Sequence, residues 1–266
     1  MATSERAWNR ALQAVTLRWE AAPRNDFGGL AGVVGILAGE VTAAIVLSLS
    51  YLMVKHGATP SMVVRDAAGL IGLWIGFVAT ALLAGPPERR RKPLRDRLVG
   101  DLGFRFRWVD LPIGVVAGLF GQYVLVLVLE LPLYPFVPHL FKRLGAPART
   151  LTSGESGMAL ALLGVLVCVG SPLVEELFFR GLFVRGLLGT ARGRLGWRAV
   201  PAVLGSAVLS GVVFGLVHFE ALQLIALSGF GVLLALMACT TGRLGAGIVA
   251  HITFNTVTFV ALATNH

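Results

Sequence analysis

Apolar stretches long enough to cross a lipid bilayer recur along this 266-residue chain. A helix needs about 20 mostly apolar residues to span the hydrocarbon core of a membrane. Hydrophobic residues make up 56% of the chain and charged residues 14%, against about 25% charged residues in an average soluble domain. The sequence therefore predicts an all-α, polytopic transmembrane helix bundle. The predicted spans are 28–54, 67–83, 111–131, 158–188, 201–219, 221–240 and 244–263.

The predicted span at 158–188 is unusually long and contains Pro172. Proline removes a backbone donor and kinks or breaks a helix. The segment is therefore either one kinked helix or two short helices, and the bundle has seven or eight helices accordingly. Cys168 and Cys239 both lie inside apolar stretches, where we expect them to be small packing residues and not a disulfide.

Arginine is concentrated in two segments between spans, at 89–107 and 185–198. Positively charged loops remain on the cytoplasmic side of a membrane, so both segments and the N-terminus are expected there. An odd number of spans then places the C-terminus outside. We expect residues 1–27 to be a cytoplasmic segment, either an amphipathic surface helix or a tail, and residues 28–150 to hold the N-terminal spans. The net charge of +9 is explained by these loops, and no nucleic-acid partner is expected.

Ionisable side chains are concentrated in the last hundred residues, although each costs at least about 2.5 kcal/mol inside a bilayer. Glu175, Glu176 and Arg180 form the first group. Residues four apart share a helix face, so Glu176 and Arg180 are expected to form an ion pair. Glu175 points about 100° away on an α-helix, in another environment, and remains free to act as a general base. The alternative is a purely structural salt-bridge network of all three residues.

Two further groups follow at helical spacing. Phe214 and His218 lie on one face, and a lone histidine in a span is more often a packing residue than a catalytic one. His251 and Asn255 place an imidazole and a carboxamide side by side, which suits stabilisation of a developing oxyanion. The alternative for this pair is a hydrogen-bonded clasp between helices. Each group alone has a structural explanation, but three spans that each carry such groups point to a reaction.

The ordered motifs Glu-Glu-x-x-x-Arg, Phe-x-x-x-His and His-x-x-x-Asn resemble the CPBP family, the CAAX prenyl endopeptidases and bacteriocin-processing (Abi) proteins. The resemblance covers about residues 155–262 and implies that 151–266 is a CPBP-like catalytic transmembrane domain. It implies an intramembrane endopeptidase in which Glu175, assisted by His218, activates water and His251 and Asn255 stabilise the oxyanion. Glu176, Arg180 and Phe214 would support these groups.

Metal dependence is left open by the sequence, because the family is often labelled as metalloproteases. The chain lacks the His-Glu-x-x-His helix motif of zinc peptidases. Glu175, His218 and His251 are the three residues able to supply zinc ligands. The metal-free interpretation is preferred, with no cofactor, because Glu175 cannot readily be both ligand and base.

The rival interpretations are a non-catalytic scaffold or immunity-type membrane protein and a proton-coupled transporter. The expected partners are the lipid bilayer and a peptide or protein substrate at the membrane. The Ala-, Gly- and Arg-rich composition suggests a bacterial plasma membrane.

Three more carboxylates lie outside the motifs. Glu40 is expected to pair with another helix or line a cavity, Glu130 to extend to the interface, and Glu220 to lie at a span boundary.

Overall fold

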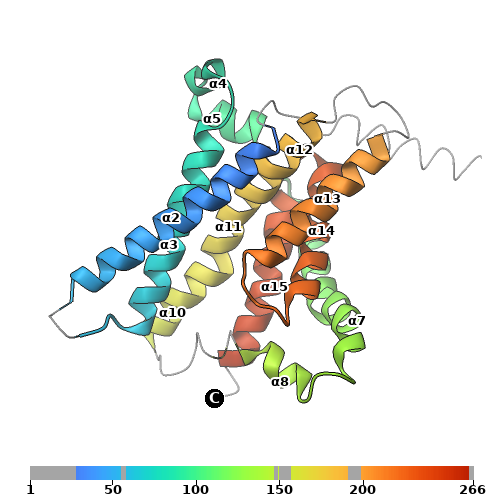
Figure 1. Cartoon of the computed structure of the whole chain (residues 1–266). Coiled ribbons are helices and arrows are strands. Elements are labelled where there is room, and N and C mark those ends of the chain that lie inside the picture. The colour runs from blue at the N-terminus through green and yellow to red at the C-terminus, as the bar shows by residue number, and fades with distance from the viewer. Residues whose placement is uncertain (1–27, 55–57, 147–148, 150–156, 191–198, 264–266) are drawn as a thin grey trace, which may run out of the picture.

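The computed structural model of the chain describes residues 28–54, 58–146, 149, 157–190 and 199–263, and the regular structure in these ranges is helical (Figure 1). The predicted N-terminal segment 1–27 lies outside the described residues. Two long helices come first, α2 (Leu30–Leu52) and α3 (Met62–Leu83). They pack closely, because Gly72 and Gly76 of α3 lie directly against the α2 backbone.

The arginine-rich segment after α3 forms three short elements, α4 (Pro87–Arg91), α5 (Leu94–Asp96) and π-helical η1 (Arg97–Asp101). One of its arginines is not a solvated loop residue. The Arg89 side chain is buried and donates to the carbonyl oxygens of Ala81, Leu82 and Ala84 at the end of α3. These carbonyls have no partner within the helix, so Arg89 caps it. Burial lowers the pKa of Arg89, and its ion pair with Asp101 partly offsets this effect.

A third long helical segment runs from residue 110 to residue 133. It comprises α6 (Asp110–Phe120), the π-helical turn η2 (Gly121–Leu125), α7 (Val126–Glu130) and the short 3-10 turn η3 (Leu131–Leu133). The short helix α8 (Leu140–Leu144) follows.

The fourth segment is helical without a break from residue 158 to residue 190. It comprises α10 (Met158–Val165), η4 (Leu166–Gly170), α11 (Ser171–Glu175), η5 (Glu176–Val184) and α12 (Arg185–Thr190), where η4 and η5 are π-helical. Pro172 therefore does not divide the segment into two helices. The π-helical turn η4 precedes the proline and absorbs the missing backbone donor.

Three helices complete the chain: α13 (Ala199–Leu216), α14 (Leu224–Thr241) and α15 (Gly245–Ala263). All seven predicted spans are therefore helical. Five helices are long and apolar enough to cross a membrane by length and composition, while Val200–Leu216 and Gly245–Ala261 are shorter apolar helices. The chain is a multi-pass integral membrane protein.

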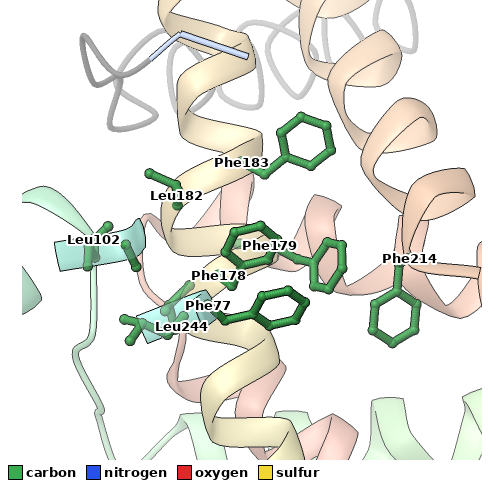
Figure 2. Packing of buried hydrophobic residues seen from close by; sticks show 11 residues of the cluster. Phe77, Leu102, Phe178, Phe179, Leu182, Phe183, Phe214 and Leu244 are labelled. Carbon is green, nitrogen blue, oxygen red and sulfur yellow. The ribbon is translucent and has the colours of Figure 1, made fainter. Parts of the chain in front are cut away.

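The fourth segment runs through the middle of the bundle (Figure 1). All nine residues of η5 are buried, and η5 packs against α2, α3, α13 and α14. Its core is aromatic, and Figure 2 shows the phenylalanines of three helices together. Phe77 of α3 stacks on Phe178 at 4.1 Å, Phe178 contacts Phe179, and Phe179 meets Phe214 of α13 edge-on at 5.2 Å. This series of rings fixes η5 relative to both neighbours.

The outward surface of the bundle is apolar. Large hydrophobic side chains such as Leu37, Ile75 and Val128 are at least half exposed. A soluble monomer rarely carries such a continuous apolar surface, whereas lipid-facing helices require it.

Two sequence expectations about charged residues are wrong. Glu130 does not extend to the interface: it is fully buried, and its Oε1 accepts a hydrogen bond from the backbone N–H of Ala226 in the first turn of α14. Arg185 is not a loop residue. It is buried in α12 and donates to the carbonyl oxygens of Asp101 and Gly242, which connects α12 to η1 and to the end of α14. Both side chains form hydrogen bonds with backbone groups at or next to helix ends, and hydropathy alone does not predict such contacts.

Candidate active site

The two adjacent glutamates lie where α11 meets η5. Glu175 is the last residue of α11 and Glu176 the first of η5. Glu176 is 0% exposed and Glu175 is 8% exposed. Both side chains point into the interior of the bundle, which is costly unless each has a polar partner.

Glu176 has two such partners. Its Oε1 accepts a hydrogen bond from Arg180 Nη1 at 2.8 Å and lies 3.1 Å from His251 Nδ1. The predicted ion pair between Glu176 and Arg180 is therefore present, with both side chains fully buried. Gly247 of α15 lies beside this carboxylate, and a Cβ there would come within 3.1 Å of Glu176 Oε2.

Arg180 is held from two further directions. Its Nη2 donates to the carbonyl oxygen of Gly231 in α14 at 2.9 Å, and its guanidinium lies over the Phe214 ring, 4.7 Å from the centroid. A planar, always-charged guanidinium suits such a site, because it combines several directed hydrogen bonds with stacking on an aromatic face. Arg180 thus connects η5, α13 and α14 around Glu176.

His251 contacts both glutamates. Its Nδ1 faces Glu176, and its Nε2 lies 3.8 Å from Glu175 Oε2. The expectation that the two carboxylates occupy separate environments is therefore wrong. The two ring nitrogens face different carboxylates. One imidazole from α15 therefore contacts two adjacent residues, Glu175 and Glu176, although their side chains leave the helix in different directions.

Glu175 is the less constrained of the two carboxylates. Oε2 of each glutamate has no hydrogen-bond partner among the described residues, but Glu176 is held through Oε1 by Arg180, and Glu175 retains slightly more exposure. A carboxylate oxygen that is buried but not hydrogen-bonded to protein is the group most available to a water molecule or a substrate.

His218 lies just beyond the end of α13, in the turn that leads to α14. Its Nδ1 lies 2.6 Å from the carbonyl oxygen of Phe214. A carbonyl only accepts, so this contact places a proton on Nδ1 and leaves the Nε2 lone pair of the neutral ring free. The Phe214 ring is 4.6 Å from the His218 ring and 5.6 Å from the His251 ring. Both histidines therefore lie at the same level of the bundle, although His218 is much farther from the start of its span.

Asn255 reaches a different neighbour. Its Nδ2 donates to the carbonyl oxygen of Val167 in η4 at 2.9 Å. That carbonyl lacks an ordinary helical donor, because the Ser171 N–H bonds to Leu166 and Pro172 has no N–H. The predicted clasp between helices is thus formed, and the second amide hydrogen of Asn255 is not used by this bond.

Among the described residues, no group of three or more His, Cys, Asp and Glu side chains is placed to hold a metal ion. The conditional zinc set of Glu175, His218 and His251 is therefore not assembled. In both histidines Nδ1 already faces another group, the carbonyl oxygen of Phe214 for His218 and Glu176 for His251, so only Nε2 of each ring could act as a ligand.

Ser210 was not anticipated from the sequence. It lies one turn before Phe214 on α13, is fully buried, and its Oγ has no hydrogen-bond partner among the described residues. Arg180 Nε is likewise without a partner in the described part of the chain. A serine within an apolar helix gives no signal of its own, because Ser is common in membrane spans as a small packing residue.

Comparison with known proteins agrees with the motif-based resemblance. Residues 157–257 match the family model described as type II CAAX prenyl endopeptidase Rce1-like. No curated protein and no solved structure matches the chain. The matched region contains Glu175, Glu176, Arg180, His218, His251 and Asn255. Over residues 157–257 the chain is thus similar to the Rce1-like, type II CAAX prenyl endopeptidase family of the CPBP group, in agreement with the resemblance that the sequence motifs indicated.

Proposed function

We propose that this chain is an intramembrane endopeptidase that hydrolyses a peptide bond in a membrane-associated substrate with Glu175 and the two histidines. The observation that carries this proposal is the pair of buried carboxylates on either nitrogen of His251, with Oε2 of Glu175 lacking a protein donor. The family match supports the same class of reaction.

In the proposed reaction Glu175 removes a proton from a water molecule, and the resulting hydroxide attacks the substrate carbonyl carbon. The free Nε2 lone pair of His218 accepts a hydrogen bond from that water and orients it. The tetrahedral oxyanion receives hydrogen bonds from the unused Asn255 N–H and from Nε2–H of His251, which acts here as the imidazolium because its Nδ1–H already donates to Glu176. Protonated Glu175 then returns its proton to the leaving amine as the C–N bond breaks.

Glu176, Arg180 and Phe214 have a positioning role in this scheme. Glu176 holds the imidazole of His251 through Nδ1, so that Nε2 faces Glu175. Arg180 balances the charge of Glu176 in an interior where an unpaired carboxylate is strongly unfavourable. Phe214 separates the two histidines and supports Arg180 with its ring.

The proposal extends to the organisation of the chain. Residues 28–150 would form the N-terminal helices and 151–266 the catalytic domain. Seven or eight elements would cross a bacterial plasma membrane, including the shorter apolar helices α13 and α15. The interfacial aromatic residues Phe106 and Trp108, both exposed beside Arg105 and Arg107, suit the headgroup level at the arginine-rich end.

The direct test uses the full chain in liposomes together with membrane-anchored peptides. Mass spectrometry of the peptide termini, with and without the protein, should reveal new termini that depend on the protein. A transporter would instead produce proton-coupled flux without new termini. A scaffold would bind peptides and leave them intact, and either result would contradict the proposal.

Chelators provide a separate prediction. In the proposed scheme Glu175 acts as the base, a role that it cannot readily combine with that of a zinc ligand, so no metal takes part. We expect treatment with 1,10-phenanthroline to leave the initial rate of cleavage unchanged. A loss of cleavage that added Zn²⁺ restores, while the metal-free protein remains folded, would show that Glu175, His218 and His251 bind zinc instead.

A further inference from the structure

Glu130 of α7 lies outside the matched residues 157–257, and none of the motifs assigned above uses it. Its side chain is 0% exposed. Oε1 accepts a hydrogen bond from the Ala226 N–H at 3.2 Å, and Oε2 has no partner in the described part of the chain. A buried carboxyl with one backbone donor contributes little net stability, because its desolvation costs about as much as the bond returns. Ionisable residues in membrane segments usually have a functional role.

The bond from Ala226 fixes the start of α14. Gln223, the residue before this helix, makes no side-chain capping bond, so the N–H groups of the first turn need acceptors from other parts of the bundle. Glu130 supplies such an acceptor at the third residue of the helix. Its neighbour Leu129 lies directly against Gly229, where a Cβ would overlap with it. Helix α7 thereby sets the depth and rotation of the first turns of α14.

The same turns of α14 contact the candidate active site. Phe230 lies four residues after Ala226 and therefore on the same helix face. The Phe230 ring is 0% exposed, meets the His251 ring edge-on with 5.7 Å between centroids, and stacks on Phe254 at 4.1 Å. At 1.5 Å per residue, the ring is attached only about 6 Å along the axis from the bond to Glu130. A helix is rigid over one turn, so a shift at Ala226 moves this ring.

The third segment also touches the Phe230 ring directly. Gly121 of the π-helical turn η2 lies against it, and a Cβ at this position would be 2.7 Å from Cε2 of the ring. Single π-helical turns within α-helices often occur at functional sites. The ring is thus enclosed by Gly121, Phe254 and His251, and any shift of the ring changes its contact with the imidazole.

We infer that Glu130 is a positioning residue for His251. It holds the first turn of α14, and this turn fixes the Phe230 ring against the imidazole. The inference rests on the proposed function, in which Nε2 of His251 must face Glu175 and the oxyanion. Without the acceptor for the Ala226 N–H, the start of α14 moves relative to α7 and the imidazole loses its fixed orientation. A displacement of about 1 Å at a reacting group costs up to about 100-fold in rate.

Kinetics of full-length variants in liposomes test this role. Glu130→Ala should lower kcat for a membrane-anchored peptide about tenfold and leave KM nearly unchanged, because only the orientation of a reacting group changes. Glu130→Gln keeps an acceptor oxygen at the same position and should restore most of the rate. Gln122→Leu is the matched control, since it removes another interhelical bond of the third segment, the one that Thr258 donates at 3.1 Å in α15, and should retain the native kcat.

Two kinetic results would overturn the inference. A purely structural role of Glu130 would lower the Tm of Glu130→Ala and leave the kcat of the folded protein at the native level. An equal loss of kcat in Glu130→Gln and Glu130→Ala would show that the hydrogen bond to Ala226 does not carry the effect. Circular dichroism at the assay temperature establishes that each variant is folded.

The imidazole also gives a readout that does not require cleavage. In nanodiscs that hold the chain with isotope-labelled histidine, the ring-nitrogen resonances of His251 are assigned by comparison with His251→Gln. Glu130→Ala should shift these resonances. Gly121→Ala presses on the Phe230 ring from the other side and should shift them as well, which keeps the test available if Glu130→Ala does not fold. Gln122→Leu should leave them unchanged.

The resonances separate this inference from the proposed function. Unchanged His251 signals in the Glu130 and Gly121 variants would overturn the inference, whether or not the native chain cleaves peptides. If the signals moved while the native chain cleaved no peptide, the proposed function would be wrong and the connection from Glu130 to His251 would stand.

Discussion

Replacing Glu175 by glutamine should abolish peptide cleavage while leaving the protein folded. A positioned general base contributes about 10²- to 10⁴-fold to rate, and glutamine cannot remove a proton from water. The substitution keeps the shape of the side chain. Glu175 Oε2 has no hydrogen-bond partner among the described residues, and its distance to His251 Nε2 is 3.8 Å, too long for a hydrogen bond, so little of the fold's stability depends on its charge. We expect a loss of kcat in this range, measured with a membrane-anchored peptide in liposomes, and a nearly unchanged Tm.

Glu220→Gln is the matched control for this experiment. Glu220 lies two residues after His218, is partly exposed, and makes none of the contacts around Glu175. Its substitution should leave cleavage at the native level. If Glu175→Gln retained full cleavage, or if Glu220→Gln lost as much, Glu175 would not be the base.

The second large effect is expected from Arg180, and it concerns stability. Arg180 and Glu176 are both 0% exposed and lie 2.8 Å apart. Removing one partner of a buried ion pair leaves an uncompensated charge and typically costs about 3–5 kcal/mol. Arg180→Met should lower the unfolding free energy by about that amount, measured by denaturant titration in mixed micelles.

The double variant Arg180→Met with Glu176→Leu separates the charge effect from packing. With both charges replaced by apolar groups, most of the lost stability should return, because no buried charge remains unpaired. Cleavage should stay impaired, since His251 has lost the acceptor at Nδ1. Arg95→Met, an exposed arginine of α5, should be nearly neutral in stability. If the single and the double variant lost the same unfolding free energy, the loss would come from the packing of the Arg180 side chain and not from its charge.

Hydropathy predicted the helices well, because a chain in a bilayer must satisfy its backbone groups within each span. All seven predicted spans are helical in the structure, and the ends of α2, α13 and α15 fall within three residues of those expected. The prediction was weakest where backbone hydrogen bonds change register. Pro172 left open a kinked helix or two short helices, and the structure has one continuous helical segment in which η4 accommodates the proline.

The side-chain partners were only partly predictable. The Glu176–Arg180 pair follows from spacing on one helix, and the structure contains it. The contact of His251 with both glutamates joins residues 75 and 76 positions apart and has no local signal. The contact of Asn255 also has no local signal. Its amide donates to the carbonyl oxygen of Val167, which lacks a helical donor because Pro172 has no N–H.

From the sequence alone, the membrane location, the helical class and the identity of the ionisable residues were determined, because hydrophobic length and charge are properties of the residues themselves. The tertiary structure decided which of these residues meet. It placed His251 between Glu175 and Glu176, set Arg180 against Phe214, and left Glu40 facing outward. The physical reason is that rotation and depth of a helix are set by packing against its neighbours, and hydropathy carries no information about either.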